Sequence, residues 1–482
     1  MSKRVLIISD SIFRQTGYST VANKIIENLD DSYVVAQLGL SHRPVDYAAH
    51  KTQIHYYSPL LKHKECCNSD VLFEYYNPDT NKLVHINPIN AKHNITDDHC
   101  FKGVANASDP YAFESAYYVI NHFKADIVIA INDIWGMYKL AYLKNRYKFK
   151  LISYLAIDSE CFPPMIKNNE ENINTLDYIS KVDKLIVFTE WAKTTINKTA
   201  KIIRNKEFDN IDVINHGVDL NEFNNIADKR TIVKNLFNLD SDTHFIIGSV
   251  NRNQPRKRLD AIFQILRILI DKYEKSNGKR FMVHMHCAIN DSHGWDLQWL
   301  SNYYNVQDRL ILDANLKPGI GVSTELLNII MNSYDVHLVP TNSEGWGLSI
   351  LETMACGIPN VISDYSAHGD WAKDHALTIK LSAKIHEPIT NHIKGIIDIE
   401  HAAKQINLLY SNNRVYTSIK NESLKLADKL QWGNVCKHWN KLLLNTDISD
   451  LSENRYDTIK FSSNLIMFPS NPLTKEFIIE EV

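Results

Sequence analysis

The sequence VPTNSEGWGLSILETMACGIP, residues 339–359, is the stretch that most directly indicates the fold. An apolar strand pattern ends near Pro340, a turn with two glycines follows, and an apolar helix pattern continues to Gly357. This order is typical of the carboxyl edge of a parallel sheet, where open α/β folds bind their ligands. Glu344 lies in the turn and Glu352 about one turn inside the helix, so both carboxylates can face one crevice. The alternative is a capped helix whose glutamates face solvent.

Two acidic side chains at such an edge suit a ligand that carries hydroxyl groups. Each carboxylate can accept two hydroxyl hydrogen bonds, as ribose and other sugars require. An ionised carboxylate can also stabilise positive charge that develops on a reacting carbon. The glycines of the turn expose backbone N–H groups at the start of the helix. The stretch therefore predicts a ligand site.

Short apolar, β-branched runs recur along the chain with helical patterns between them. Such runs, flanked by helices, indicate parallel strands buried on both faces. Two series of these runs predict an α/β protein with two doubly wound, Rossmann-like domains. The predicted strands are 5–9, 34–40, 126–132, 151–157, 184–189 and 211–215 in the first series, and 245–251, 281–287, 310–316, 336–340, 360–363 and 377–381 in the second.

The domain boundary is expected near residues 219–231, after the first series of strands. A segment at about 45–115, rich in His, Asn, Tyr and Pro, has weak periodicity and predicts an irregular insertion or a set of long loops. Trp432 and Trp439 lie seven residues apart on a predicted helix, where packing explains them. The expected division is an N-terminal domain at 1–222, a C-terminal domain at 223–400, C-terminal helices at 401–447 and a tail of unknown role at 448–482.

A basic loop follows the first strand of the second series. Arg252, Arg256, Lys257 and Arg258 fall within seven residues, directly before a helix expected at 261–273. Cations normally avoid a helix N-terminus, because the helix dipole is already positive there. The placement is reasonable if a multiply charged anion lies between these side chains, since Arg and Lys both bind phosphate. The loop therefore predicts a phosphate site, and a solvated basic loop is the alternative.

A second phosphate-binding turn is expected at residues 10–20, between the first strand and the first helix. Gly17 allows a sharp turn and a close approach of ligand to backbone, and Ser19 or Thr20 can cap the helix. The Gly-x-Gly-x-x-Gly fingerprint of dinucleotide sites is absent. A plain strand-to-helix turn is the alternative.

Composition narrows the class of protein. The 482 residues carry a formal net charge of -3, which gives no general attraction to nucleic acid or anionic membranes. The seven cysteines form no C-x-x-C pair, so a reducing, cytoplasmic location is expected. The apolar run at the start is too short for a signal peptide, and no window is long enough to span a membrane. We expect no cofactor and no metal site.

The spacing of Glu344 and Glu352 resembles the E-x7-E motif of retaining glycosyltransferase family 4, whose members have the GT-B fold. The resemblance is strong over about residues 210–370. It implies two Rossmann-like domains that face a cleft, with a nucleotide-sugar bound on the second. Further matching positions are Arg252, Lys257, Gly17 and the sequence HGVD at 216–219, where the family has Asn in place of His.

The resemblance implies a role for each matching residue. Glu352 would bind the ribose hydroxyls, and Glu344 would contact the transferred sugar and stabilise charge at its anomeric carbon. Arg252 and Lys257 would neutralise the leaving diphosphate. The remaining residues expected to bind the donor are Gly17, Asn251, Gly345, Trp346, Gly347 and Leu348.

One position departs from the family pattern. Many relatives carry a His near the end of the fourth strand of the first domain or in the loop that follows. The corresponding stretch here, residues 154–160, reads YLAIDSE. Asp158 is expected to take over this position and to bind the sugar or orient the acceptor hydroxyl. An acidic loop residue without a role is the alternative.

The resemblance implies a retaining hexosyltransferase with a front-face, metal-independent mechanism. The donor would be a UDP- or GDP-sugar, and the acceptor a hydroxyl of a sugar, glycan, lipid or protein. A nucleotide-sugar 2-epimerase of the same fold and a catalytically idle nucleotide- or sugar-binding protein are the alternatives. The sugar, the linkage and the oligomeric state stay open.

Overall fold

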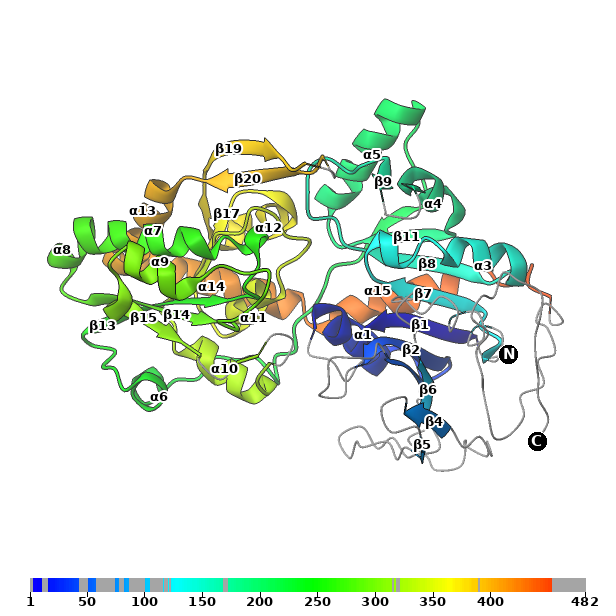
Figure 1. Ribbon diagram of the computed structural model, residues 1–482, viewed down its shortest axis with the longest axis horizontal. Coiled ribbons are helices and arrows are strands. Elements are labelled where there is room, and N and C mark those ends of the chain that lie inside the picture. Colours follow the sequence, from blue (N-terminus) through cyan, green and yellow to red (C-terminus); the bar gives the residue numbers. More distant parts are fainter. Residues whose placement is uncertain are drawn as a thin grey trace.

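Two mainly parallel sheets with helices on their faces form the two halves of the protein (Figure 1). The structure is a computed structural model. It describes residues 3–10, 16–42, 51–57, 74–77, 82–85, 100–104, 116, 120, 123–167, 172–313, 316–317, 321–388 and 391–452. The predicted tail at 448–482 lies outside these ranges beyond residue 452. The predicted α/β architecture with two Rossmann-like domains is confirmed.

The first sheet has the spatial order β12-β11-β8-β7-β1-β2-β3-β6. Its parallel strands confirm the first predicted series, although β8, β11 and β12 each end two residues earlier than expected. The order of these strands along the chain reverses between β1 and β7, so a crevice opens there at their carboxyl ends. The parallel strands are β1 (Arg4–Asp10), β2 (Val34–His42), β7 (Ile127–Ile131), β8 (Lys150–Leu155), β11 (Lys184–Val187) and β12 (Ile211–Val213).

Four further strands lie in the segment 45–115, so the prediction of loops there is wrong at these strands. β3 (Lys51–Tyr57) and β6 (Cys100–Val104) extend the first sheet with antiparallel pairing, and β4 (Glu74–Asn77) pairs with β5 (Lys82–His85). Strand pairing depends on partners distant in sequence, which local composition does not reveal. The other residues of the segment lie outside the described ranges.

The second sheet is parallel throughout and has the order β15-β14-β13-β16-β17-β18. The chain order reverses between β13 and β16, which places a second crevice at their carboxyl ends. These strands confirm the second predicted series, except that β15 ends four residues before the predicted end. They are β13 (His244–Val250), β14 (Arg280–His286), β15 (Leu310–Leu312), β16 (Val336–Val339), β17 (Asn360–Ser363) and β18 (Leu377–Ile379).

Helices cover the two faces of each sheet (Figure 1). Side chains at helix starts often accept a backbone N–H, as Thr16 does from Ser19 at the start of α1. The helix expected at 261–273 is α7 followed by a π-helical turn, Ile270–Glu274. The described helices include α1 (Gly17–Asn28), α3 (Leu140–Tyr147), α4 (Thr175–Lys181), α5 (Glu190–Arg204), α6 (Lys229–Phe237), α7 (Leu259–Leu269), α8 (Lys275–Asn277), α9 (Leu297–Tyr303), α10 (Thr324–Asn332), α11 (Leu348–Ala355), α12 (Ser366–Trp371), α13 (Ile399–Ser411), α14 (Asn413–Lys429) and α15 (Trp432–Asn445).

Two antiparallel hairpins were not expected from the sequence. β9 (Met165–Lys167) pairs with β10 (Asn172–Asn174), and β19 (Leu381–His386) pairs with β20 (Ile393–Ile397). Most side chains of β19 are exposed, so this strand lacks the apolar run that would predict it.

The last helix, α15, crosses from the second domain back to the first. Trp432 and Trp439 on this helix are both buried, which confirms the predicted packing. The largest core cluster includes them together with apolar residues of β1, α1, β16 and α11, so it joins the two sheets. The Lys3 ammonium donates to the carbonyls of Leu443, Leu444 and Thr446 at 2.6, 2.9 and 2.8 Å. A cation at the carboxyl end of α15 favours this docking, because the helix dipole is negative there.

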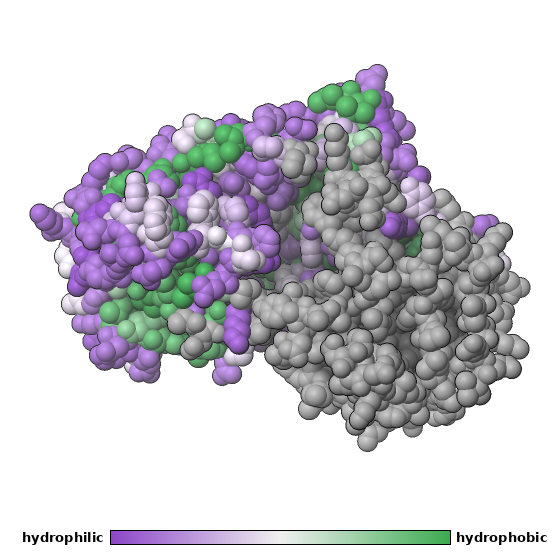
Figure 2. Space-filling view, in the orientation of Figure 1, coloured by the Kyte–Doolittle hydropathy of each residue, from purple (hydrophilic) through white to green (hydrophobic). Residues whose placement is uncertain are grey.

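The surface in view carries no continuous apolar face over the second domain. Figure 2 shows hydrophilic residues over most of this domain, with apolar residues gathered in small areas. In the described part of the chain, no helix is long and apolar enough to cross a membrane.

Candidate functional site

The loops after β13 and β16 meet at the crevice of the second sheet. Asn342 donates its backbone N–H to the carbonyl of Arg256 at 2.9 Å, and the Thr341 hydroxyl donates to the same carbonyl at 2.8 Å. These bonds hold the basic loop against the loop that carries Glu344. Chain segments about ninety residues apart therefore form one rigid edge.

Glu344 lies at the centre of this edge and is buried. One carboxylate oxygen, Oε2, accepts from Arg256 Nη1 at 2.9 Å and from the Lys257 ammonium. Burial opposes ionisation, but the two cations outweigh it and lower the pKa of Glu344 to about 2. Glu344 is therefore ionised at neutral pH and fixed in place by charged hydrogen bonds.

The backbone of Glu344 is fixed by a strained residue. Ser366 has a φ of 56°, in the left-handed region that residues other than glycine seldom adopt. Its hydroxyl accepts the backbone N–H of Glu344 at 2.9 Å, and His368 lies 3.4 Å away on its other side. Strain of this kind persists where surrounding contacts require it, and it clusters at functional sites.

The two cations predicted to bind diphosphate lie in different surroundings. Lys257 joins the Glu344 cluster, whereas Arg252 forms two hydrogen bonds with the buried Asp291, at 2.7 and 3.4 Å. The Arg252 side chain is 53% exposed and lies on the rim. Arg256, which sequence analysis counted in the basic loop but gave no role of its own, lies beside Glu344. Its only signal was membership of the basic loop. Asn251 begins this loop. Its side-chain amide donates to the Ser249 hydroxyl at 3.3 Å, and its backbone N–H donates to the carbonyl of His286 at 3.4 Å.

The turn before α11 has the expected shape. Gly347 has a φ of 90°, and a Cβ there would lie 2.7 Å from Ile350, so only glycine fits. α11 begins at Leu348, which leaves the first N–H groups of the helix directed to the crevice. The Trp346 ring is buried and stacks on Trp371 at 4.3 Å, so its side chain belongs to the core and only its backbone can contact a donor.

Glu352 differs from Glu344 in its surroundings. It is half-buried, and burial together with the nearby Glu222 raises its pKa to about 7. Among the residues that the structure describes, none forms a hydrogen bond or ion pair with its carboxylate. A ligand hydroxyl would supply the missing donor.

The first domain approaches this edge at two glycines. A Cβ on Gly17 would lie 3.4 Å from Leu348, and a Cβ on Gly345 would lie 3.3 Å from that of Ala156. Gly17 belongs to the first domain and Gly345 to the second. The cleft is therefore narrow at the positions predicted to contact the donor.

Asp158 faces the cationic edge from the first domain. Burial opposes its ionisation, but Lys394 and then Arg256 lower its pKa. Its neighbour Asp133 accepts the Tyr18 hydroxyl at 2.8 Å, and burial, with help from Asp158, raises the pKa of Asp133 to about 6. Lys394, Asp133 and Tyr18 were missed, because no motif marks them in the sequence.

The HGVD segment at 216–219 forms the junction between the domains. His216 is buried and lies 2.8 Å from the Tyr154 hydroxyl, and burial lowers its pKa to about 3. A Cβ on Gly217 would lie 2.8 Å from the ring of Trp432, so glycine is required there. These residues therefore hold the start of α15 at the junction between the domains.

A possible metal-ligand group lies two strands from Glu344. His284, His286 and Asp313 place their ligand atoms within 4.8 Å of one another. Both imidazoles bond to one Asp313 oxygen, at 3.2 and 2.6 Å, and the Tyr334 hydroxyl bonds to His284 at 2.9 Å. These groups satisfy one another as hydrogen-bond partners, which accounts for their burial without an ion.

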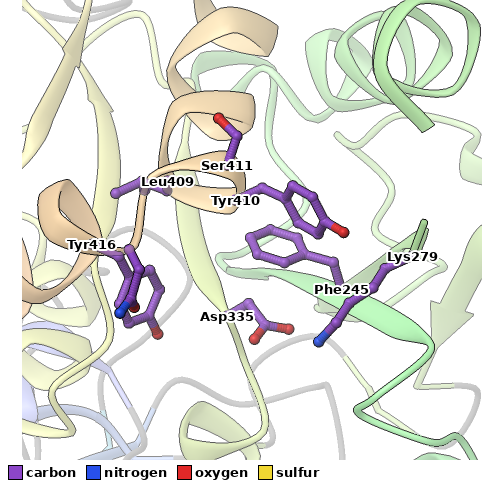
Figure 3. Close-up of a pocket in the computed structure, with 8 residues that line it drawn as sticks. Phe245, Lys279, Asp335, Leu409, Tyr410, Ser411 and Tyr416 are labelled. Carbon is purple, nitrogen blue, oxygen red and sulfur yellow. The ribbon is translucent and has the colours of Figure 1, made fainter. Parts of the chain in front are cut away.

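A pocket of about 450 Å³ lies at the opposite edge of the second sheet (Figure 3). Phe245 and Asp335 line it at the amino ends of β13 and β16, with Lys279 and Tyr410 nearby. The Phe245 and Tyr410 rings pack edge to face at 5.2 Å. This position is remote from the Glu344 loop, so the pocket is separate from the cleft.

Comparison with known proteins agrees with this arrangement. Residues 234–425 match the family described as glycosyl transferases group 1. The D-inositol 3-phosphate glycosyltransferase of Mycolicibacterium smegmatis is 28% identical over 205 residues, which cover 41% of this chain and 40% of that protein. The match therefore spans about two fifths of that relative's length.

Solved structures share the fold across both domains. Sucrose-phosphate synthase from Thermosynechococcus elongatus aligns with a TM-score of 0.60 at 14% identity, over 92% of this chain and 98% of that one. Anabaena Alr3699/HepE, in complex with UDP and glucose, aligns with a TM-score of 0.58 at 11% identity, over 92% and 100%. At such identities the likeness shows the fold alone. The chain therefore has the GT-B fold, and its residues 234–425 are similar to the group 1 glycosyl transferases.

Proposed function

We propose that this protein is a retaining hexosyltransferase that uses a nucleotide-diphosphate-sugar donor and a hydroxyl acceptor. One observation carries the proposal. The ionised Glu344, held by Arg256 and Lys257 at the crevice of the second sheet, faces Asp158 of the first domain across a narrow cleft. A cation pair beside a carboxylate suits a site where a diphosphate leaves and positive charge develops on a sugar.

In the proposed reaction the bond between the anomeric carbon and the diphosphate oxygen breaks, and its electron pair stays with the diphosphate. The acceptor oxygen forms the new bond on the same face, and the acceptor proton passes to the departing phosphate oxygen. Lys257 and Arg256 would stabilise the negative charge on the leaving group, with Arg252 at the rim. Glu344 would stabilise the charge on the sugar. These side chains, and no metal ion, would neutralise the diphosphate.

The donor base is proposed from the nature of the site and from similar proteins. Glu352 has no partner among the described residues, and ribose hydroxyls would supply one. Anabaena Alr3699/HepE has been solved with UDP-glucose, and an Escherichia coli protein of this fold with UDP-2-fluoro glucose. We therefore propose a UDP-sugar as the first donor to test, with GDP-sugars as the second.

Replacement of Lys257 by Met tests the proposal, with Arg258→Met as a matched control. Both remove one cation from the same loop, but Arg258 pairs with Asp260 at 2.9 Å and not with Glu344. Loss of one leaving-group cation should lower kcat by roughly 10²–10³. The control should keep most of the wild-type rate. Equal rates in the two variants would contradict the assignment.

The rival functions give different products. A thermal-shift screen of UDP, GDP and their sugars first identifies the donor, because a ligand that binds the native state raises the melting temperature. Conversion of a UDP-sugar with no acceptor present would indicate a 2-epimerase. Donor binding without transfer or donor hydrolysis would indicate an idle binding protein.

A further inference from the structure

The β19–β20 hairpin of the second domain reaches the first domain beside the cleft (Figure 1). Lys384 on β19 forms an ion pair with Glu160 at 2.5 Å. The Tyr365 hydroxyl accepts the backbone N–H of Glu160 at 3.4 Å and donates to the carbonyl of Ile393 at 2.5 Å. The hairpin therefore contacts the loop that carries Asp158.

Lys394 on β20 lies between the two domains and is only 6% exposed. Its ammonium donates to the hydroxyl of Ser159 in the first domain and to that of Ser343 in the second, both at 2.9 Å. Asp158 Oδ2 lies 3.6 Å from the same ammonium. One buried cation thus joins the residue before Glu344 to the residue after Asp158.

β20 is fixed to the same edge that holds Glu344. Gly395 donates its backbone N–H to the carbonyl of Asn342 at 2.9 Å. A Cβ at Gly395 would lie 2.8 Å from the Tyr365 ring, so this close packing requires glycine. Lys394 is therefore held by the second domain, and its contacts with the first domain exist only while the cleft is closed.

We propose that Lys394 is a positioning residue, which orients the Asp158 carboxylate in the cleft and does so only when the two domains are together. Burying a lysine is unfavourable unless its three N–H donors find partners. Ser159 and Ser343 accept hydrogen bonds from the two sides, and Asp158 supplies an opposite charge 3.6 Å away. Separation of the domains would leave the ammonium without its first-domain partners. The contact therefore couples the geometry of Asp158 to closure, and its catalytic consequence rests on the proposed function.

Other charged and titratable groups also face Asp158. Arg256 lowers its pKa in the same direction as Lys394, and His392 has a smaller effect of the same sign. Loss of the Lys394 charge should therefore raise the Asp158 pKa partway, since Arg256 remains. The groups that interact with Asp158 across the cleft and within its own domain are Lys394, Arg256, His392, Lys257, Tyr365, Asp133 and Tyr18.

Hydrogen exchange measured by mass spectrometry tests the contact without any assay of activity. Lys394→Met should raise exchange in residues 156–162 by roughly 10- to 100-fold, the effect of losing hydrogen bonds to a buried charge. Lys394→Arg should stay closer to wild type. Lys384→Met is the matched control on the same hairpin. The ion pair between Lys384 and Glu160 is partly exposed, so its loss should raise exchange by about fivefold at most. Equal exchange in Lys394→Met and Lys384→Met would overturn the proposal.

Kinetics then separate positioning from general stability. Lys394→Met should lower kcat with little change in donor KM, and it should move the acid limb of the pH–rate profile to higher pH. Lys394→Arg should restore both in part. A lower rate with an unmoved acid limb would overturn the positioning role.

If Lys394→Met fails to fold, Ser159→Ala provides a second test. It removes the first-domain hydrogen-bond partner of Lys394 and should raise exchange in residues 156–162, and unchanged exchange there would also overturn the proposal. Wild-type protein that transfers no sugar, but shows the expected exchange pattern, would refute the proposed function and leave the contact established.

Discussion

Replacement of Glu344 by Gln and of Glu352 by Gln should change stability in opposite directions, although both lie in one motif. The Glu344 pKa is lowered from 4.5 to about 2, which corresponds to about 3 kcal/mol at about 1.4 kcal/mol per pKa unit. The Glu352 pKa is raised from 4.5 to about 7, which corresponds to a penalty of similar size, up to about 3 kcal/mol, once it ionises. Burial raises the pKa of both carboxyls, but two cations outweigh it at Glu344, whereas at Glu352 no cation opposes burial and Glu222 adds to it.

The sign of each pH dependence follows from linkage. Ionised Glu344 stabilises the native state above pH 4.5, and this stabilisation is lost as the pH falls through about 2. Wild type should therefore exceed Glu344→Gln in stability at pH 7, and the gap should narrow below pH 4.5. Glu352 behaves in the opposite way. Its contribution is fully present below pH 4.5 and is lost as the pH rises through about 7, so Glu352→Gln should exceed wild type at pH 8.

Equilibrium urea unfolding at pH 8, 7, 5 and 4, followed by tryptophan fluorescence, measures both effects. Comparison of each variant with wild type at the same pH cancels the other carboxylates. Calorimetric titration with UDP adds a second measurement. Glu344→Gln should keep UDP affinity, because Arg256 and Lys257 then lack a competing anion. Two variants that shift stability in the same direction at pH 8, or a Glu344→Gln protein as stable as wild type at pH 7, would refute this account of the site.

Three further substitutions test the packing that shapes the cleft. Gly345→Val should impair closure against Ala156, where a Cβ already comes within 3.3 Å, and small-angle scattering should detect a more open particle, whereas an unchanged radius of gyration would contradict the contact. Gly217→Ala should lower stability by about 1–3 kcal/mol, because the added methyl overlaps Trp432, and an unaltered urea midpoint would count against it. Lys3→Met should lower stability by roughly 1–3 kcal/mol, because three carbonyls at the end of α15 lose their charged donor, and near-ultraviolet circular dichroism should report looser packing of that helix.

Much of the fold could be predicted because parallel strands and their helices leave periodic patterns. Both strand series and the strand–turn–helix at 339–359 are local features, and the structure confirms them. The β19–β20 hairpin could not be predicted, because exposed strands carry no apolar run. β3 and β6 could not be predicted either, because their partners are distant in sequence.

The candidate site shows the same division. Glu344 and Lys257 lie in recognisable motifs, and the structure brings them into contact. The structure places Arg252 on the rim with Asp291, and it places Arg256 beside Glu344. The order of the four cations along the loop does not reveal which of them contacts Glu344. Lys394 has no motif, and only the fold carries it to Asp158.

The sequence by itself determined the α/β class, two parallel sheets, a glycine turn before a helix, and a loop of cations, because each depends on residues close together in the chain. Tertiary structure alone decided which cation meets which carboxylate, and why two glutamates eight residues apart have pKa values of about 2 and about 7. The physical reason is that charge interactions and burial depend on distance in space. The loop after β13, the loop after β16 and the hairpin beyond β18 come together only when the second sheet has formed, and Asp158 joins them only when the two domains meet.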